Sequence, residues 1–116
     1  WLDMVLIRYA CMVNGVTDLA LTILDGLDER DTIKVCVAYD IDGERHDFPP
    51  ANRAAWDRAQ PIYEEFPGWQ SDTTSARSWD DLPENARAYL PRLGELAGAP
   101  VSYIGNGPER EQTIVV

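Results

Sequence analysis

Basic residues are scarce in this sequence. Of its 116 residues, 20 are Asp or Glu and only 10 are Lys or Arg, which gives a formal net charge of -10. A field of this sign repels a polyanion, and no stripe of Lys and Arg is present to offset the repulsion. We therefore expect no binding to nucleic acid. A phosphate-bearing ligand would need backbone N–H donors or a local cation.

Cysteine is also rare, and the two cysteines present are not spaced for zinc. Cys11 and Cys36 each lie inside an apolar run, which is typical of small buried side chains. Neither belongs to a Cys-x-x-Cys pair. Unpaired, buried thiols suit a reducing compartment, so we predict a cytoplasmic protein.

Long apolar runs are missing as well. The longest, residues 4–13, is interrupted by Arg8 and is far too short to span a bilayer. No charged segment followed by an apolar one opens the chain, so we expect neither a signal peptide nor a membrane partner. The first residue, Trp1, stands inside an apparent helix, which indicates a piece of a longer protein.

That first segment, residues 2–13, is apolar nearly all round, which predicts a helix buried on most of its sides. Asn14-Gly15 should end it. Residues 51–60 predict a weaker helix.

A second strong helical pattern follows Pro83, which suits a first helical turn, with Asp81 just before it as a candidate cap. Gly98 is the expected end of the helix. Pro91 falls inside the pattern and should kink or divide the helix. The apolar positions that follow the 3.6-residue period are Ala86, Tyr89, Leu90, Leu93, Leu96 and Ala97.

Residues 33–39 form the clearest strand pattern. Both faces are apolar, which indicates a central strand. Simple alternation places Val35, Val37 and Tyr39 on one face together with Ile33. Asp42-Gly43 follows, which predicts a tight hairpin into residues 44–48.

Shorter segments complete an alternating pattern of strands and helices. Residues 19–22, 101–104 and 113–116 are short apolar stretches, and residues 61–66 alternate in polarity. We predict an α/β fold in which helices flank a mixed sheet.

Few residues suggest chemistry on their own. Asp40-Ile41-Asp42-Gly43 resembles the start of a calcium loop, but it lacks the remaining oxygen ligands, so the hairpin is the preferred interpretation. His46 has no Ser or Cys motif beside it and is expected to be solvated. Glu64 and Glu65 are neighbours on a strand and would point to opposite faces.

The segment Gly105-Asn106-Gly107-Pro108 allows two interpretations. Two glycines between short strands let the backbone approach a ligand closely. The same residues also suit an ordinary hairpin turn. Local sequence favours the turn and does not exclude the ligand site.

Several blocks, taken in order, are similar to one family, the adenylosuccinate synthetases, and together they cover essentially the whole chain. Each block alone is weak, but the ordered set is specific. The blocks are Trp1-Leu2-Asp3, Arg8-Tyr9-Ala10, Val13-Asn14-Gly15-Val16, Leu19-Ala20-Leu21-Thr22, residues 33–39, Pro61-Ile62-Tyr63-Glu64-Glu65, Pro67-Gly68-Trp69, and residues 82–89 and 107–115.

This resemblance implies a GTP- and Mg²⁺-dependent ligase that joins IMP and L-aspartate in AMP biosynthesis, acting as a homodimer. GTP phosphorylates the 6-oxygen of IMP, and aspartate then displaces the phosphate. The family's phosphate loop, catalytic Asp and His, and substrate arginines lie upstream of Trp1. Residues 1–116 would then be the C-terminal portion of a P-loop-NTPase-like fold. They would contribute a wall of the guanine pocket, hold no Mg²⁺ ligand and be inactive alone.

In the family, a Thr-Lys-Leu-Asp segment reads the guanine base. The ungapped match here is Thr22 followed by Ile23, Leu24 and Asp25, so Asp25 keeps the carboxylate while Ile23 replaces the Lys. A gapped match instead aligns residues 24–29 with the family residues that follow the motif. In that match the chain lacks the Asp that reads guanine. The ungapped match is preferred because the number of residues between Thr22 and Ile33 equals the number in the family.

The family's second guanine segment, Ser-Thr-Gly-Pro-Asp-Arg, corresponds to residues 105–110. Gly105, Asn106 and Gly107 would therefore border GTP through their backbone. The chain departs from the family in lacking the Lys and in having Pro91 within a helix. These departures leave two alternatives to a GTP-specific ligase open. One is a non-catalytic acidic α/β module that binds a nucleotide or a protein. The other is a ligase that also accepts ATP.

Overall fold

The computed structural model describes all 116 residues. Its elements, in chain order, are β1 Leu2–Asp3, α1 Met4–Asn14, β2 Leu19–Leu21, the 3-10 turn η1 Leu24–Leu27, β3 Thr32–Ile41, β4 Glu44–His46, α2 Arg53–Arg58, β5 Gln60–Pro67, the 3-10 turn η2 Trp79–Asp81, α3 Glu84–Ala97, β6 Val101–Gly105 and β7 Thr113–Val115.

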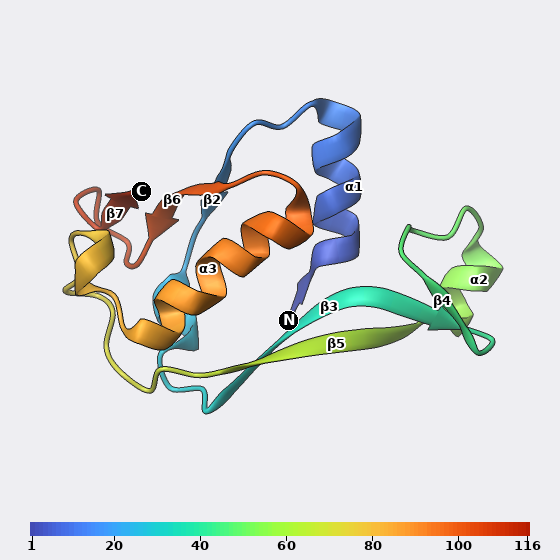
Figure 1. Cartoon of the computed structure of the whole chain (residues 1–116), viewed down its shortest axis with the longest axis horizontal. Helices are drawn as coiled ribbons and strands as arrows, with labels where there is room; N and C mark the ends of the chain where they lie inside the picture. Colours follow the sequence, from blue (N-terminus) through green and yellow to red (C-terminus); the bar gives the residue numbers. More distant parts are fainter.

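The strands divide into two mixed sheets. In the larger sheet, β3 pairs with β5 along one edge, and with β1 and β4 along the other; only the β1–β3 pair is parallel. In the smaller sheet, β6 lies between the parallel strand β2 and the antiparallel strand β7. Figure 1 shows α3 running between the two sheets. The predicted α/β class with a mixed sheet is confirmed.

Helix α3 packs its predicted apolar stripe into the core. Five of the six predicted positions are buried and Leu96 is half-buried. Gly98 ends the helix at φ 80°, as expected. Pro91 does not divide the helix, which runs without a break from Glu84 to Ala97. The Pro91 ring lies on the exposed face, where water can satisfy the freed carbonyl.

Asp81 does not cap α3, so that prediction is also wrong. The Asp81 carboxylate instead accepts the backbone N–H of Ser78, and the two residues form a capping box around η2. Pro83 directly precedes α3 and contributes no side-chain cap.

A β-bulge in β3 changes which of its residues share a face. A register irregularity lies between Cys36 and Ala38, where Val37 is the extra residue. Such a bulge reverses the alternation beyond it. Tyr39 therefore joins Cys36 in a second small cluster instead of facing Ile33 and Val35, and the predicted common face is wrong at Tyr39.

The hairpin after β3 is confirmed. Asp42 and Gly43 both have positive φ, 55° and 85°, the combination of a tight type I′ turn. The Asp40 carboxylate accepts the N–H of Gly43 at 2.9 Å. The acidic residues of this segment thus shape a turn.

Helix α1 begins and ends at recognisable caps. The Asp3 carboxylate accepts the backbone N–H groups of Val5 and Leu6 at 3.0 and 3.2 Å, and Gly15 ends the helix at φ 63°. The Tyr39 hydroxyl also donates to Asp3, which ties the start of α1 to β3.

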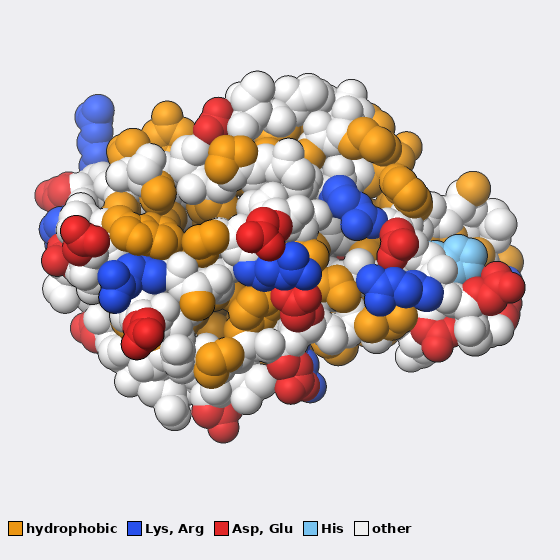
Figure 2. All heavy atoms as spheres, in the orientation of Figure 1, with side chains coloured by type: hydrophobic (Ala, Val, Ile, Leu, Met, Phe, Trp, Pro, Cys, Tyr) orange, Lys and Arg blue, Asp and Glu red, His pale blue; other side chains and the backbone are white.

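Within this chain, α1 is not buried on most of its sides, contrary to the prediction. Only Met4, Val5 and Cys11 are buried. Four apolar side chains stay exposed because no other segment of the 116 residues covers them: Leu6, Tyr9, Met12 and Val13. Figure 2 shows apolar side chains at the surface near this helix.

The chain is also thin for its length. Its extents are 45 × 32 × 21 Å and its radius of gyration is 15.4 Å, against about 13 Å for a compact domain of similar size. No helix combines the length and apolar character needed to cross a bilayer; the longest, α3, has 14 residues.

We predict that the isolated 116-residue chain self-associates through the exposed face of α1. Met12→Lys should shift the chain toward monomer, because it removes a 61% exposed apolar side chain from that face. Ala54→Lys is the control, since it adds the same charge at an exposed position of another helix, α2, and leaves the exposed face of α1 unchanged. Size-exclusion chromatography with light scattering measures the effect. A wild-type chain that is monomeric and melts well above mesophile values would contradict the prediction.

Candidate functional site

The parallel pairing of β2 and β6 brings the two predicted base segments together. Leu21 pairs with Ile104, so residues 22–25 and 105–107 both begin at the carboxyl ends of neighbouring strands. Ligands of α/β sheets commonly bind at such strand ends. The approach is close, because a Cβ added to Gly105 would lie 3.6 Å from the Cα of Thr22.

Residues 23–25 have three different environments. Ile23 is 71% exposed, Leu24 is buried in the core, and Asp25 is half-buried. The Leu24 side chain is therefore unavailable to a ligand and anchors the segment instead. Ile23 has a left-handed backbone, with φ 59° and ψ 41°, which is strained for a β-branched residue.

Asp25 borders a polar hollow of about 950 Å³. The hollow is also lined by Gly26, Asp28, Glu29, Arg30, Gln70, Ser71, Asp72 and Thr74, and by no hydrophobic residue. Hydrogen bonds from the Thr74 hydroxyl and backbone hold the pKa of Asp72 below its usual range. The hollow offers carboxylate acceptors for N–H groups and no hydrophobic side chain to cover an aromatic base.

The three predicted residues of the second segment do not line this hollow. Asn106 is fully buried, and its side-chain amide donates to the backbone carbonyls of Thr73 and Ala76. Its own backbone N–H donates to the carbonyl of Gln112 at 2.9 Å. A Cβ added at Gly107 would collide with the Gln112 side chain. Packing within the protein therefore constrains this loop closely.

Sequence reasoning missed the contacts of Asp28 and Thr73. The Asp28 carboxylate accepts hydrogen bonds from Trp69 Nε1 at 2.8 Å and from the Thr73 N–H and Oγ1 at 2.7 and 2.8 Å. Residues 71–76 form a loop, and neither motif nor periodicity marks Thr73 as buried.

The other candidate residues stand apart from this edge. The His46 side chain is 42% exposed, with Nε2 3.9 Å from a carboxylate oxygen of Glu44. No group of three or more His, Cys, Asp and Glu is placed to hold a metal ion. Cys11 and Cys36 are free and buried, as predicted.

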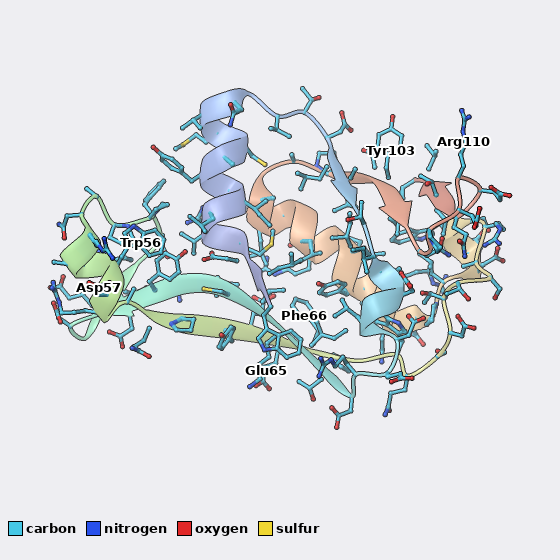
Figure 3. The ribbon with its side chains drawn as sticks, turned by 180° about the vertical axis from the view of Figure 1, so that it is seen from behind. Trp56, Asp57, Glu65, Phe66, Tyr103 and Arg110 are labelled. Atoms are coloured by element: carbon cyan, nitrogen blue, oxygen red, sulfur yellow. The ribbon has the colours of Figure 1, made fainter.

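Glu64 and Glu65 point to opposite faces of β5, as predicted. Glu64 accepts two hydrogen bonds of 2.8 Å from Arg92 on α3, and these lower the pKa of Glu64. Glu65 lies on the other face, 3.7 Å from Lys34. Figure 3 shows Phe66 turned toward α3 while Glu65 points away, in agreement with the edge-to-face contact between Phe66 and Tyr89.

These features define an α/β protein with two loops held at the carboxyl ends of a parallel strand pair. The family model described as adenylosuccinate synthetase matches residues 1–114, and the chain belongs to this family. It is 55% identical to the adenylosuccinate synthetase of Mycobacterium marinum over 99% of the chain, and 51% identical to that of Geotalea daltonii over all of it. It spans only 27% of the length of each of these relatives.

A solved structure agrees with these matches. The chain superposes on a fully ligated adenylosuccinate synthetase from Plasmodium falciparum with a TM-score of 0.94 and 32% identity. The superposition covers 100% of this chain and 28% of that structure. The fold of this portion is thus conserved between the two proteins.

We predict that Ile23→Asn stabilises the chain by about 1 kcal/mol, because Asn tolerates the left-handed backbone and little buried surface is lost. Val115→Asn is the matched control. Val115 is equally exposed, at 70%, and β-branched, but it lies in a strand, so the change should be neutral or destabilising. Urea denaturation at low protein concentration measures both. If the Ile23→Asn chain is less stable than wild type, the claim that the backbone at Ile23 is strained is wrong.

Proposed function

We propose that this chain forms the guanine-binding wall of a GTP-dependent ligase that joins IMP and L-aspartate into adenylosuccinate. The observation that supports it most is the meeting of residues 22–25 and 105–107 at one strand edge, in a chain of the adenylosuccinate synthetase family. The matched relatives are named as synthetases, so a non-catalytic module is not favoured.

Within this wall, Asp25 is the proposed reader of the base. Its carboxylate would accept two N–H groups from the guanine edge, which adenine does not offer in the same arrangement. Its half-buried position beside a polar hollow suits that role. The exposed Ile23 side chain would cover part of the base plane in place of the family's Lys. We therefore expect weaker GTP binding than in typical relatives, with the preference over ATP reduced but retained.

The remaining parts of the reaction are proposed to lie outside residues 1–116. These are the phosphate loop, the catalytic residues, the sites for IMP and aspartate, and the ligands of Mg²⁺. The parent is proposed to be a cytoplasmic homodimer of AMP biosynthesis. The net charge of -10 argues against nucleic acid as a partner.

The 116-residue chain alone is expected to form no adenylosuccinate from IMP, aspartate and GTP. Phosphoryl transfer needs groups that cradle the phosphates and Mg²⁺, and we place these elsewhere in the parent. Chromatographic detection of the product provides the measurement, with the full-length parent as the positive control. Product formed by the purified chain alone would disprove the proposal that the catalytic parts lie outside residues 1–116.

Asp25→Asn in the full-length parent should remove most of its preference for GTP over ATP. A bidentate contact to a base edge contributes roughly 1–3 kcal/mol of discrimination, so the preference should fall by roughly 5- to 150-fold. Glu29→Gln is the control, because it neutralises another carboxylate of the same hollow and should leave the preference intact. Competition between GTP and ATP provides the readout. An unchanged ratio in Asp25→Asn would favour the gapped match, in which Asp25 does not read the base.

A further inference from the structure

Thr73 lies at the centre of a hydrogen-bond chain that the proposed function does not use. It is 1% exposed although its loop is largely exposed. Its backbone N–H and hydroxyl both donate to the Asp28 carboxylate, at 2.7 and 2.8 Å. Its carbonyl accepts from the side-chain amide of Asn106. Every polar group of Thr73 thus has a partner inside the protein.

On one side, this chain reaches the first base segment. The backbone N–H of Asp28 donates to the carbonyl of Asp25 at 3.2 Å, so the two residues belong to one turn. Trp69 Nε1 donates a further hydrogen bond of 2.8 Å to the Asp28 carboxylate. A carboxylate with three N–H and O–H donors is held firmly, and it holds the turn that carries Asp25.

On the other side, the chain reaches the second base segment. Asn106, which lies between Gly105 and Gly107, donates to the carbonyls of Thr73 and Ala76. Its side-chain oxygen is buried without a hydrogen-bond partner, which is costly. In return, the amide donates hydrogen bonds to two carbonyls of one loop.

No hydrogen bond joins the two base segments directly beyond the ends of β2 and β6. The last strand pair is Leu21 with Ile104, and past it the links run through residues 69–76. Gln112 adds a parallel link, since its side chain donates to the Thr74 carbonyl at 3.1 Å. The loop of residues 69–76 is therefore the brace between the segments.

We infer that Thr73, together with Asp28 and Asn106, is a positioning residue that sets the separation of the two base segments. It thereby controls the affinity and guanine selectivity of the nucleotide site. The inference rests on the proposed function for the identity of the ligand. Displacement of hydrogen-bonding groups by a fraction of an ångström weakens recognition, so loosening the brace should weaken binding of GTP without affecting IMP or aspartate.

The test compares three variants of the full-length parent. Thr73→Val removes the hydroxyl donated to Asp28 while keeping the shape of the side chain. Thr73→Ser keeps the hydroxyl and should rescue the site. Thr32→Val makes the same change at an exposed Thr of β3, outside this hydrogen-bond chain, and should behave as wild type. Steady-state kinetics give kcat and the KM of each substrate, with ATP as the competing triphosphate.

In Thr73→Val we expect the KM for GTP to rise about tenfold, since a hydrogen bond to a charged group is lost. The preference for GTP over ATP should fall, while kcat and the KM values for IMP and aspartate stay within about twofold. An unchanged KM for GTP, or an equal loss for all three substrates, would overturn the inference. If Thr73→Val does not fold, Asn106→Ala is measured and judged by the same criteria.

The failure of the proposed function is distinguishable from this result. A wild-type parent that forms no adenylosuccinate would contradict the proposed function. Calorimetric titration of wild type and Thr73→Val with GDP would then test the brace by itself. Weaker GDP binding in the variant supports the brace, and equal binding, or none to either protein, contradicts it.

Discussion

Burial of one face of α3 holds this chain together. Its stripe belongs to one apolar cluster together with Ile33 and Val35 of the larger sheet and Ile104 and Ile114 of the smaller one. Each such side chain contributes roughly 1.5–3 kcal/mol when it leaves water. The two sheets share no strand, and α3 supplies more buried residues to their common core than any other element.

The position of the two proposed base segments follows from strand pairing in the smaller sheet. Because β2 and β6 pair in parallel, their carboxyl ends lie together, and the segments after them start side by side. Strand pairing stops at those ends, however. Beyond them, hydrogen bonds among Asp28, Thr73 and Asn106 link the segment after β2 to the segment after β6. Affinity and selectivity of the proposed site thus depend on residues that need not touch the ligand.

Features governed by local rules could be predicted from the sequence. The stripe of α3, its end at Gly98, the central strand β3 and the turn at Asp42-Gly43 each follow from periodicity or from backbone preference. The resemblance also located the two base segments that the structure brings together. Whether Asp25 or the loop of residues 105–107 contacts a base remains a prediction.

Features that depend on tertiary context were not predictable. The bulge at Val37 places Tyr39 on another face. Pro91 is exposed, and α3 continues through it without a break. Thr73 meets Asp28 and Asn106 from 45 and 33 residues away along the chain, so no local pattern could reveal the contacts.

The most direct test of the account is a crystal structure of the full-length parent bound to GDP. We predict that the guanine edge donates to the Asp25 carboxylate and that residues 105–107 border the base. A base bound elsewhere, or an Asp25 carboxylate beyond hydrogen-bonding distance of it, would contradict the account.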